Sequence, residues 1–217
     1  MTDRMDMTQE PPAPRDDPTR DKIKAAAQRL FSTHGLDGVS VRDIVKAAGA
    51  RNGASLHYYF GSKEGLFVAC LDRAGGRLGS EIERIADGEA VGIERGILTL
   101  AGMFTVLEPE RHLWRILHDR TAPTTGPVAE TIAAHTDRIG KLAHEGVTEL
   151  LALAGDRDPR DVSAMTAAWL GIVDSLMSWW VDHPDETADS MLSRCVRLVE
   201  ALFSDATRVH LSTGDIA

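Results

Sequence analysis

The spacing of apolar residues near the start of the chain restricts the possible fold more than any other feature of the sequence. Between Pro18 and Gly35, apolar side chains recur at intervals of three and four residues, which is the spacing of one face of an α-helix. These positions are Ile23, Ala26, Ala27, Leu30 and Phe31. Glycine commonly follows the last turn of a helix because it adopts the left-handed backbone conformation without strain, so this helix is predicted to end at Gly35.

More helices are predicted along the rest of the chain. Ser40 is placed to cap a short helix that Gly49 ends, a third short helix runs through Tyr59, and Ser62 caps a longer fourth helix towards Gly88. Five helical stretches follow, at residues 91–107, 109–119, 127–153, 159–182 and 185–206. Strand-like alternation does not occur over any length. The sequence therefore predicts an all-α fold, with a three-helix head joined through the fourth helix to a larger helical body.

Charge is distributed unevenly between these two parts. The formal net charge is −9, yet the segment from Thr19 to Gly65 carries eight basic and four acidic residues and is therefore +4, which leaves −13 for the remainder. Salt screens charges beyond roughly 8–10 Å, so only the local field acts on a bound phosphate. A basic head on an acidic body is compatible with a nucleic-acid partner.

The two cysteines and the apolar content indicate the cellular compartment. Cys70 and Cys195 lie far apart and form no CxxC or metal-type spacing, as expected of reduced, buried thiols in the cytoplasm. No apolar run approaches the length of a membrane span. The N-terminal residues lack the apolar core of a signal peptide, and their four prolines and mixed charge favour a disordered arm. A cytoplasmic protein is predicted.

Two short helices joined by a glycine-containing turn, after a longer packing helix, are typical of a helix-turn-helix head. One set of apolar residues would form its core: Val41, Ile44, Val45 and Ala48 against Leu30, Phe31 and Leu56. The third helix then presents polar side chains outward, namely Asn52, Ser55, His57, Tyr58 and Tyr59, with Arg51 and Lys63 on either side. Such a helix is suited to the major groove of DNA.

The stretch "VSVRDIVKAAGARNGASLHYYFGSKEGLF" resembles the DNA-binding domain of the TetR family of bacterial transcriptional regulators, and the resemblance covers about residues 18–77. It differs from the commonest family pattern in two respects. Ten residues rather than nine separate Gly49 from Phe60, and His57 stands where a tyrosine is usual. The resemblance implies a homodimer whose variable C-terminal domain binds a small ligand. The implied organisation is a disordered arm (1–17), the DNA-binding head (18–77), the ligand-binding and dimerisation body (78–206) and a tail (207–217).

The head supplies eight candidate DNA contacts. They are Arg42, Arg51, Asn52, Ser55, His57, Tyr58, Tyr59 and Lys63. Arg42 and Lys63 stand at helix starts, where a lysine or arginine opposes the helix dipole unless a phosphate meets it and the free N–H groups. Packing inside the head is the alternative for Tyr58 and Tyr59, and Phe60 is assigned to the core.

The helix expected at 159–182 carries a stripe of small residues beside a stripe of large ones, and the last helix is apolar on two sides. In the family the last two helices form a four-helix bundle between subunits, which implies burial by a partner. The candidate dimer residues are Ala164, Ala168, Gly171, Ser175, Ser178, Cys195, Leu198 and Leu202. The candidate ligand residues, from helices that surround a cavity in the family, are Met103, Leu107, Trp114, His118, His135, Ile139 and Trp169. Core filling is the alternative for each of them.

The fourth helix contains Gly75, Gly76 and Gly79, each of which costs roughly 0.8–1 kcal/mol relative to alanine within a helix. Two explanations stay open at this point. The glycines are either tolerated surface positions, or they form a compliant segment through which ligand binding changes the spacing of the heads.

The pattern as a whole predicts a sequence-specific DNA-binding regulator. In its fullest form this is a homodimeric repressor that a small-molecule effector releases from a palindromic operator. A TetR-like activator and a protein-binding adaptor that retains the helix-turn-helix as scaffold are the alternatives. Paired acids, a Ser/His/Asp set, glycine-rich phosphate loops and metal-binding spacings are missing from the sequence. We therefore expect no enzyme activity, no cofactor and no metal.

Overall fold

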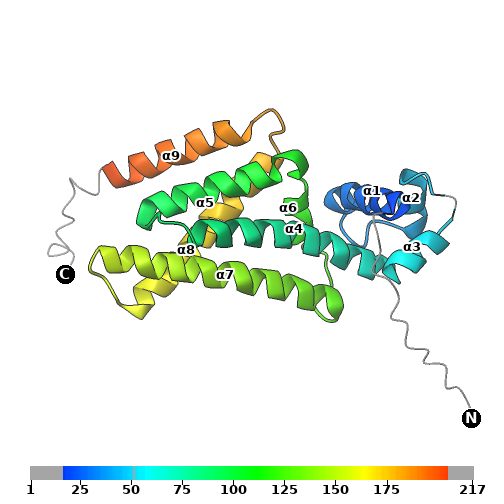
Figure 1. The fold of residues 1–217 in the computed structure, drawn as a ribbon, viewed down its shortest axis with the longest axis horizontal. Helices are drawn as coiled ribbons and strands as arrows, with labels where there is room; N and C mark the ends of the chain where they lie inside the picture. Colours follow the sequence, from blue (N-terminus) through cyan, green and yellow to red (C-terminus); the bar gives the residue numbers. More distant parts are fainter. Residues whose placement is uncertain (1–16, 51, 205–217) are drawn as a thin grey trace, which may run out of the picture.

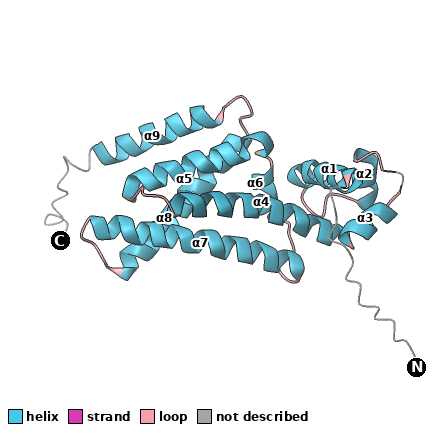
Figure 2. Ribbon diagram, in the orientation of Figure 1, coloured by secondary structure: helices cyan, strands magenta, loops and turns pink. Residues whose placement is uncertain are grey.

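A computed structural model describes residues 17–50 and 52–204 of the chain, with side chains as far as Leu198. All regular structure in these residues is helical, which confirms the all-α prediction (Figures 1 and 2). The predicted arm before residue 17, the tail after residue 206 and the candidate contacts Arg51 and Leu202 lie outside the described backbone or side chains.

The head consists of three helices and the start of a fourth. These are α1 (Pro18–His34), α2 (Val41–Ala47), α3 (Ala54–Phe60) and α4 (Lys63–Ala86). Local sequence fixes their ends. Ser40 and Asp43 form a capping box at the start of α2, and the Ser62 hydroxyl accepts a hydrogen bond from the Gly65 N–H, so both predicted caps are present. Gly35 follows α1 with φ of 68°, a conformation that favours glycine.

One apolar core runs from the head into the body without interruption. Ile44 of α2 and Leu56 of α3 are fully buried in it, and Phe31 of α1 meets Phe67 of α4 edge to face, with ring centroids 5.0 Å apart. The two seven-residue helices, α2 and α3, would be marginal alone. They are held because each inserts a fully buried aliphatic side chain, Ile44 or Leu56, into the shared core.

The body contains α5 (Gly92–Leu107), a 3₁₀ turn η1 (Glu108–Glu110), α6 (Leu113–Leu117), α7 (Pro127–Leu153), α8 (Pro159–Val181) and α9 (Ala188–Ser204). The single helix expected at 109–119 is therefore divided. Pro109 has no N–H with which to continue the ladder of α5, and only a short helix follows it. α4 runs beside α7, α9 packs along α5, and the far ends of α7 and α9 point away from the head (Figure 1).

Two of the α4 glycines allow α7 to approach closely. A Cβ atom at Gly75 would lie 2.4 Å from Cγ of His135, and one at Gly79 would lie 2.5 Å from a guanidinium nitrogen of Arg138. Both α7 side chains are held over the glycines by acids of α4. His135 Nε2 lies 3.1 Å from Asp72 Oδ1, and the Arg138 guanidinium forms two hydrogen bonds with the Glu83 carboxylate. Gly75 and Gly79 therefore have a packing role that neither of the two sequence-based explanations included.

Neighbouring glycines should respond in opposite directions to the same substitution. Gly75→Ala gains helix propensity but drives a methyl group into the His135 ring, so the free energy of unfolding should fall by about 1–2 kcal/mol. No atom lies within 4 Å of a Cβ built at Gly76, so Gly76→Ala should raise it by about 0.5–1 kcal/mol. Urea denaturation followed by circular dichroism measures both. Equal effects would show that α7 is not closely packed on α4.

Candidate nucleic-acid interface

The helix α3 has one buried side and one side open to solvent. Leu56 is fully buried, whereas the Tyr58 side chain is 83% exposed and His57 is exposed as well. The Asn52 side-chain oxygen accepts a hydrogen bond of 3.1 Å from the Ala54 N–H, so Asn52 helps to cap the helix. His57 Nδ1 lies 3.0 Å from the Gly61 carbonyl oxygen at the other end. The outward side of α3 therefore combines an aromatic ring with polar groups that can meet base edges.

Tyr59 has an internal partner that the sequence did not indicate. Its hydroxyl donates a hydrogen bond to the carboxylate of Asp17, the residue that caps α1 through the Thr19 N–H. The hydrogen bond from Tyr59, with help from the Thr19 N–H, holds the pKa of Asp17 below its usual value, and the same contact raises the pKa of Tyr59. The phenol thus ties the last turn of α3 to the first turn of α1. The Asp-Pro sequence at 17–18 is a signal for the cap, although not for the tyrosine.

Lys63 also bonds within the protein. Its ammonium group donates to the carbonyl oxygens of Leu36, at 2.9 Å, and Val39, at 3.1 Å. It therefore fixes the connection between α1 and α2 from the start of α4. An ammonium group has three donors, so two are used here. Contact between Lys63 and a phosphate stays a prediction, as do DNA contacts by the other predicted residues.

Arg42 is exposed in the first turn of α2. The neighbouring residue, Asp43, uses its carboxylate to cap the helix, because it accepts hydrogen bonds from both the hydroxyl and the N–H of Ser40. These hydrogen bonds, the hydroxyl first, lower the pKa of Asp43 and keep it as a carboxylate. The guanidinium of Arg42 is exposed at the surface in the first turn of a helix, a position that suits a phosphate.

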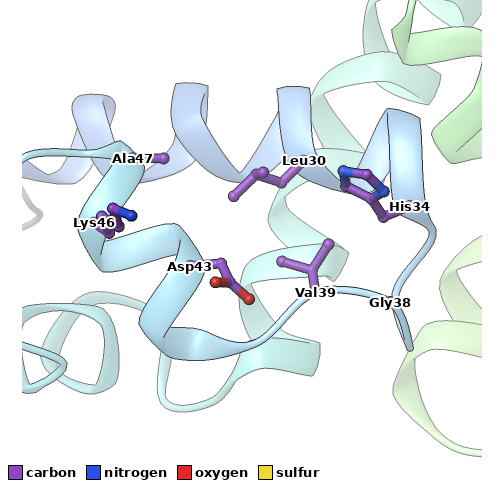
Figure 3. Close-up of a pocket in the computed structure, with 7 residues that line it drawn as sticks. All are labelled: Leu30, His34, Gly38, Val39, Asp43, Lys46 and Ala47. Atoms are coloured by element: carbon purple, nitrogen blue, oxygen red, sulfur yellow. The ribbon is translucent and has the colours of Figure 1, made fainter.

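A shallow groove crosses the head between α1 and α2 (Figure 3). Apolar and charged side chains share its walls, and its lining residues are Leu30, His34, Gly38, Val39, Asp43, Lys46 and Ala47. A second groove lies along α4, lined by Gly76, Arg77, Ser80, Glu81, Arg84 and Val106. The candidate DNA contacts and the candidate ligand residues line neither of them.

The candidate ligand residues divide between the core and the surface. Met103, Leu107 and Trp114 are buried, while Ile139 and Trp169 are half-buried against the core. His118 is exposed and stacks on Trp114 with ring centroids 4.0 Å apart. His135 lies against Gly75 between α4 and α7, as described above. The indole Nε1 of Trp114 is buried and has no hydrogen-bond partner among the described residues.

The candidate dimer residues divide in a similar way. Ala164, Ala168, Gly171, Ser175 and Ser178 are all exposed along one side of α8. Large apolar side chains of the same helix are also open to solvent, namely Met165, Ile172 and Trp179, as is Leu198 of α9. Cys195 differs, because it is only 2% exposed and belongs to the core of its own chain. The reason is that α9 packs along α5, which turns the Met191–Cys195 side inward.

Comparison with known proteins relates both the head and much of the body to bacterial transcriptional regulators. The family model described as bacterial regulatory proteins, tetR family, matches residues 23–70. The transcriptional repressor AcnR of Corynebacterium glutamicum is 35% identical over 101 residues, which are 46% of this chain and 47% of AcnR. The chain thus spans about half the length of that relative. The helix-turn-helix-type regulator Rv1255c of Mycobacterium tuberculosis is 30% identical over 176 residues, covering 77% of this chain and 79% of Rv1255c.

Solved structures share the fold. The ketosteroid transcriptional regulator KstR2 of Mycobacterium tuberculosis superimposes with a TM-score of 0.72 over 85% of this chain and 94% of that chain, at 21% identity. The transcriptional regulator FadR of Bacillus subtilis, solved in complex with stearoyl-CoA, gives a TM-score of 0.61 over 80% of this chain and 95% of that chain, at 18% identity. Because the match to Rv1255c extends at 30% identity well beyond the head, the chain belongs to the TetR family of bacterial regulatory proteins.

Proposed function

We propose that this protein is a cytoplasmic, homodimeric transcriptional repressor that binds a palindromic DNA operator and is released from it by a small-molecule effector. The observation that carries the proposal is the two-sided character of α3. Leu56 anchors the helix in the core, while the Tyr58 side chain is 83% exposed on the opposite side. Several relatives, among them AcnR at 35% identity, are named as repressors, which favours repression over activation.

The internal contacts of Tyr59 and Lys63 narrow the proposed DNA-binding set. Direct contacts with bases fall to Ser55, His57 and Tyr58, with Asn52 at the start of the helix. Arg42 meets a phosphate at the start of α2. Tyr59 ties α3 to the start of α1, and Lys63 ties the start of α4 to the α1–α2 connection, so both residues support the interface whether or not they also reach the DNA.

The α8 surface supports a dimer. Small exposed residues at its centre let a second helix approach closely, and Met165, Ile172 and Trp179 supply apolar area at its edge. A two-fold interface must be self-complementary, and one small stripe flanked by large side chains meets that requirement. Two heads on one palindrome give more base contacts than one head can make.

The indole of Trp114 supports an effector. A buried donor without an acceptor costs about 1–3 kcal/mol, and such groups are rare in native proteins. An apolar ligand that carries a carbonyl or hydroxyl oxygen would satisfy this donor. Trp114 lies in α6, which contacts both α1 and α8, so a ligand here would act between the head and the proposed dimer helix.

Two further observations concern the residues that the structure describes. The described helices are too short or too polar to span a lipid bilayer. Residues 17–50 and 52–204 hold no group of three His, Cys, Asp or Glu side chains able to bind a metal ion. Selection from random duplex DNA with the full chain tests the proposal directly. Enrichment of a palindromic motif supports the proposal. If the bound DNA shows no enriched motif, the proposal is overturned.

The salt dependence of binding to the selected motif should report the Arg42 contact. Binding releases condensed counterions, so the logarithm of the association constant falls linearly with the logarithm of salt concentration. Arg42→Ala should reduce the magnitude of that slope by about one unit per head. Arg157→Ala removes the same charge from the connection between α7 and α8, at the end of the body far from the head (Figure 1), and should leave the slope unchanged. Identical slopes for both variants would remove Arg42 from the interface.

A further inference from the structure

The backbone of Leu36, in the connection between α1 and α2, is held at both ends by residues from elsewhere in the chain. Its N–H donates a hydrogen bond of 2.8 Å to Oδ2 of Asp119, and its carbonyl oxygen accepts one of 2.9 Å from Lys63. Its side chain is buried. Asp119 belongs to the body and follows α6, 83 residues further along the chain. The contact therefore joins head to body directly, apart from the covalent path through α4.

A neighbouring residue of the body orients the Asp119 carboxylate toward the head. Its second oxygen, Oδ1, accepts hydrogen bonds from the N–H of Thr121, at 2.8 Å, and from the Thr121 hydroxyl, at 2.6 Å. Gly35 lies directly against this pair. A Cβ atom there would be 2.6 Å from the Thr121 hydroxyl oxygen and 3.2 Å from both Asp119 oxygens. Gly35 thus meets two requirements, a φ of 68° and a close approach to the body.

The segment before Asp119 connects it to the proposed dimer helix. His118 Nδ1 lies 3.0 Å from the Trp114 carbonyl oxygen, and its ring stacks on the Trp114 indole. Its Nε2 lies 3.6 Å from Oδ1 of Asp174 in α8. Leu113 and Ile116 fix α6 in the core. The residues between α6 and α7 are therefore positioned by α8 on one side and bonded to Leu36 on the other.

We propose that Asp119 is a positioning residue for DNA binding, because its bond to Leu36 fixes the orientation of the head on the body. In a dimer this orientation determines the distance between the two α3 helices, and that distance selects the spacing of operator half-sites. The inference rests on the proposed function, since it assumes two heads on one palindrome. Asp119 does not touch DNA, and its effect passes through the Leu36 peptide.

Two substitutions of Asp119 distinguish the effect of its hydrogen bond to Leu36 from the effect of its negative charge. Asp119→Asn and Asp119→Ala remove the same negative charge, so their electrostatic effects on DNA binding are equal. Asparagine keeps one oxygen that can accept from the Leu36 N–H, and its amide group can donate to the Thr121 hydroxyl, although it loses the bond from the Thr121 N–H. Alanine keeps neither. We expect D119A to bind the selected operator about tenfold more weakly than D119N, with the same salt slope.

The spacing preference distinguishes positioning from a general loss of stability. The wild type and D119N should prefer the selected operator over one with a single base pair inserted between the half-sites, and D119A should lose much of that preference. Three results would overturn the proposal. They are equal affinity of D119A and D119N, tighter binding by D119A, or an equal loss on both operators with the preference intact.

Hydrogen exchange provides a readout that needs no DNA. The Leu36 amide should be protected from exchange in the wild type and in D119N, and should exchange faster in D119A. If the wild type selects no palindrome but the Leu36 amide follows this pattern, the proposed function fails while the head–body bond stands. If Leu36 exchanges equally in all three proteins, the positioning role is refuted whatever the DNA result.

Discussion

Trp180→Ala should lower the free energy of unfolding by about 3–5 kcal/mol, because it removes a fully buried ring from the centre of the body. The indole packs edge to face on Phe104 with centroids 5.1 Å apart, and the Arg111 guanidinium carbon lies 4.4 Å from the ring centroid. Its Nε1 donates a hydrogen bond of 2.8 Å to the Glu186 carbonyl oxygen, which closes the connection between α8 and α9. Alanine would leave a cavity and remove one of the two hydrogen bonds to this carbonyl oxygen, the other being donated by Arg111 at 2.9 Å.

The adjacent tryptophan is the matched control. Trp179 is 41% exposed and stacks on His183 at the surface, so Trp179→Ala should change the free energy of unfolding by less than about 1 kcal/mol. Urea denaturation followed by circular dichroism measures both variants. The measurement must be made at a concentration where all three proteins are monomeric, because Trp179 belongs to the proposed dimer surface and self-association shifts the apparent stability. Equal losses for the two variants would contradict the described position of α8.

Gly171→Leu should weaken the proposed dimer roughly 30-fold or more, because the two-fold axis repeats each overpacking cost of about 1–3 kcal/mol. The single chain shows no obstacle to this substitution. Nothing lies within 4 Å of a Cβ atom built at Gly171, which is exposed on α8. The folded monomer should therefore keep its stability while association is lost. Operator binding should fall together with association, since a single head makes fewer base contacts.

Gly146→Leu serves as the control for this experiment. Gly146 lies within α7, and a Cβ atom built there also has nothing within 4 Å, so leucine is accommodated on a different surface. Sedimentation velocity over a range of concentrations should show dimer dissociation only for Gly171→Leu. A wild type that is monomeric at micromolar concentration, or equal behaviour of the two variants, would exclude α8 as the dimer surface.

The sequence predicted those helix ends and core positions that depend only on residues nearby in the chain. Ser40 and Ser62 cap the helices expected of them, and Gly35 ends α1, because a cap needs only residues within about four positions. Leu56 and Phe31 were assignable to the core from helical spacing alone. The division of the stretch at 109–119 was not predicted, although Pro109 was visible as the signal for it.

The partners of the polar residues could not be predicted in the same way. The hydroxyl of Tyr59 and the ammonium group of Lys63 meet groups 42, 27 and 24 residues away, and such pairs depend on how α1, α3 and α4 pack. Cys195 illustrates the same limit for apolar residues. Both sides of α9 are apolar in sequence, and only the position of α5 decides which side is covered within the chain.

The hydrogen bond from Tyr59 to Asp17 has a practical consequence for handling the protein. It places the beginning of α1 beside α3, so a purification tag fused ahead of residue 17 joins the folded chain next to the helix proposed to enter the major groove. A bulky tag there would compete with the DNA duplex for space. The last turns of α9 lie at the opposite end of the body (Figure 1). Surface immobilisation or a fluorophore is therefore better introduced after α9, where it leaves the path of the duplex free.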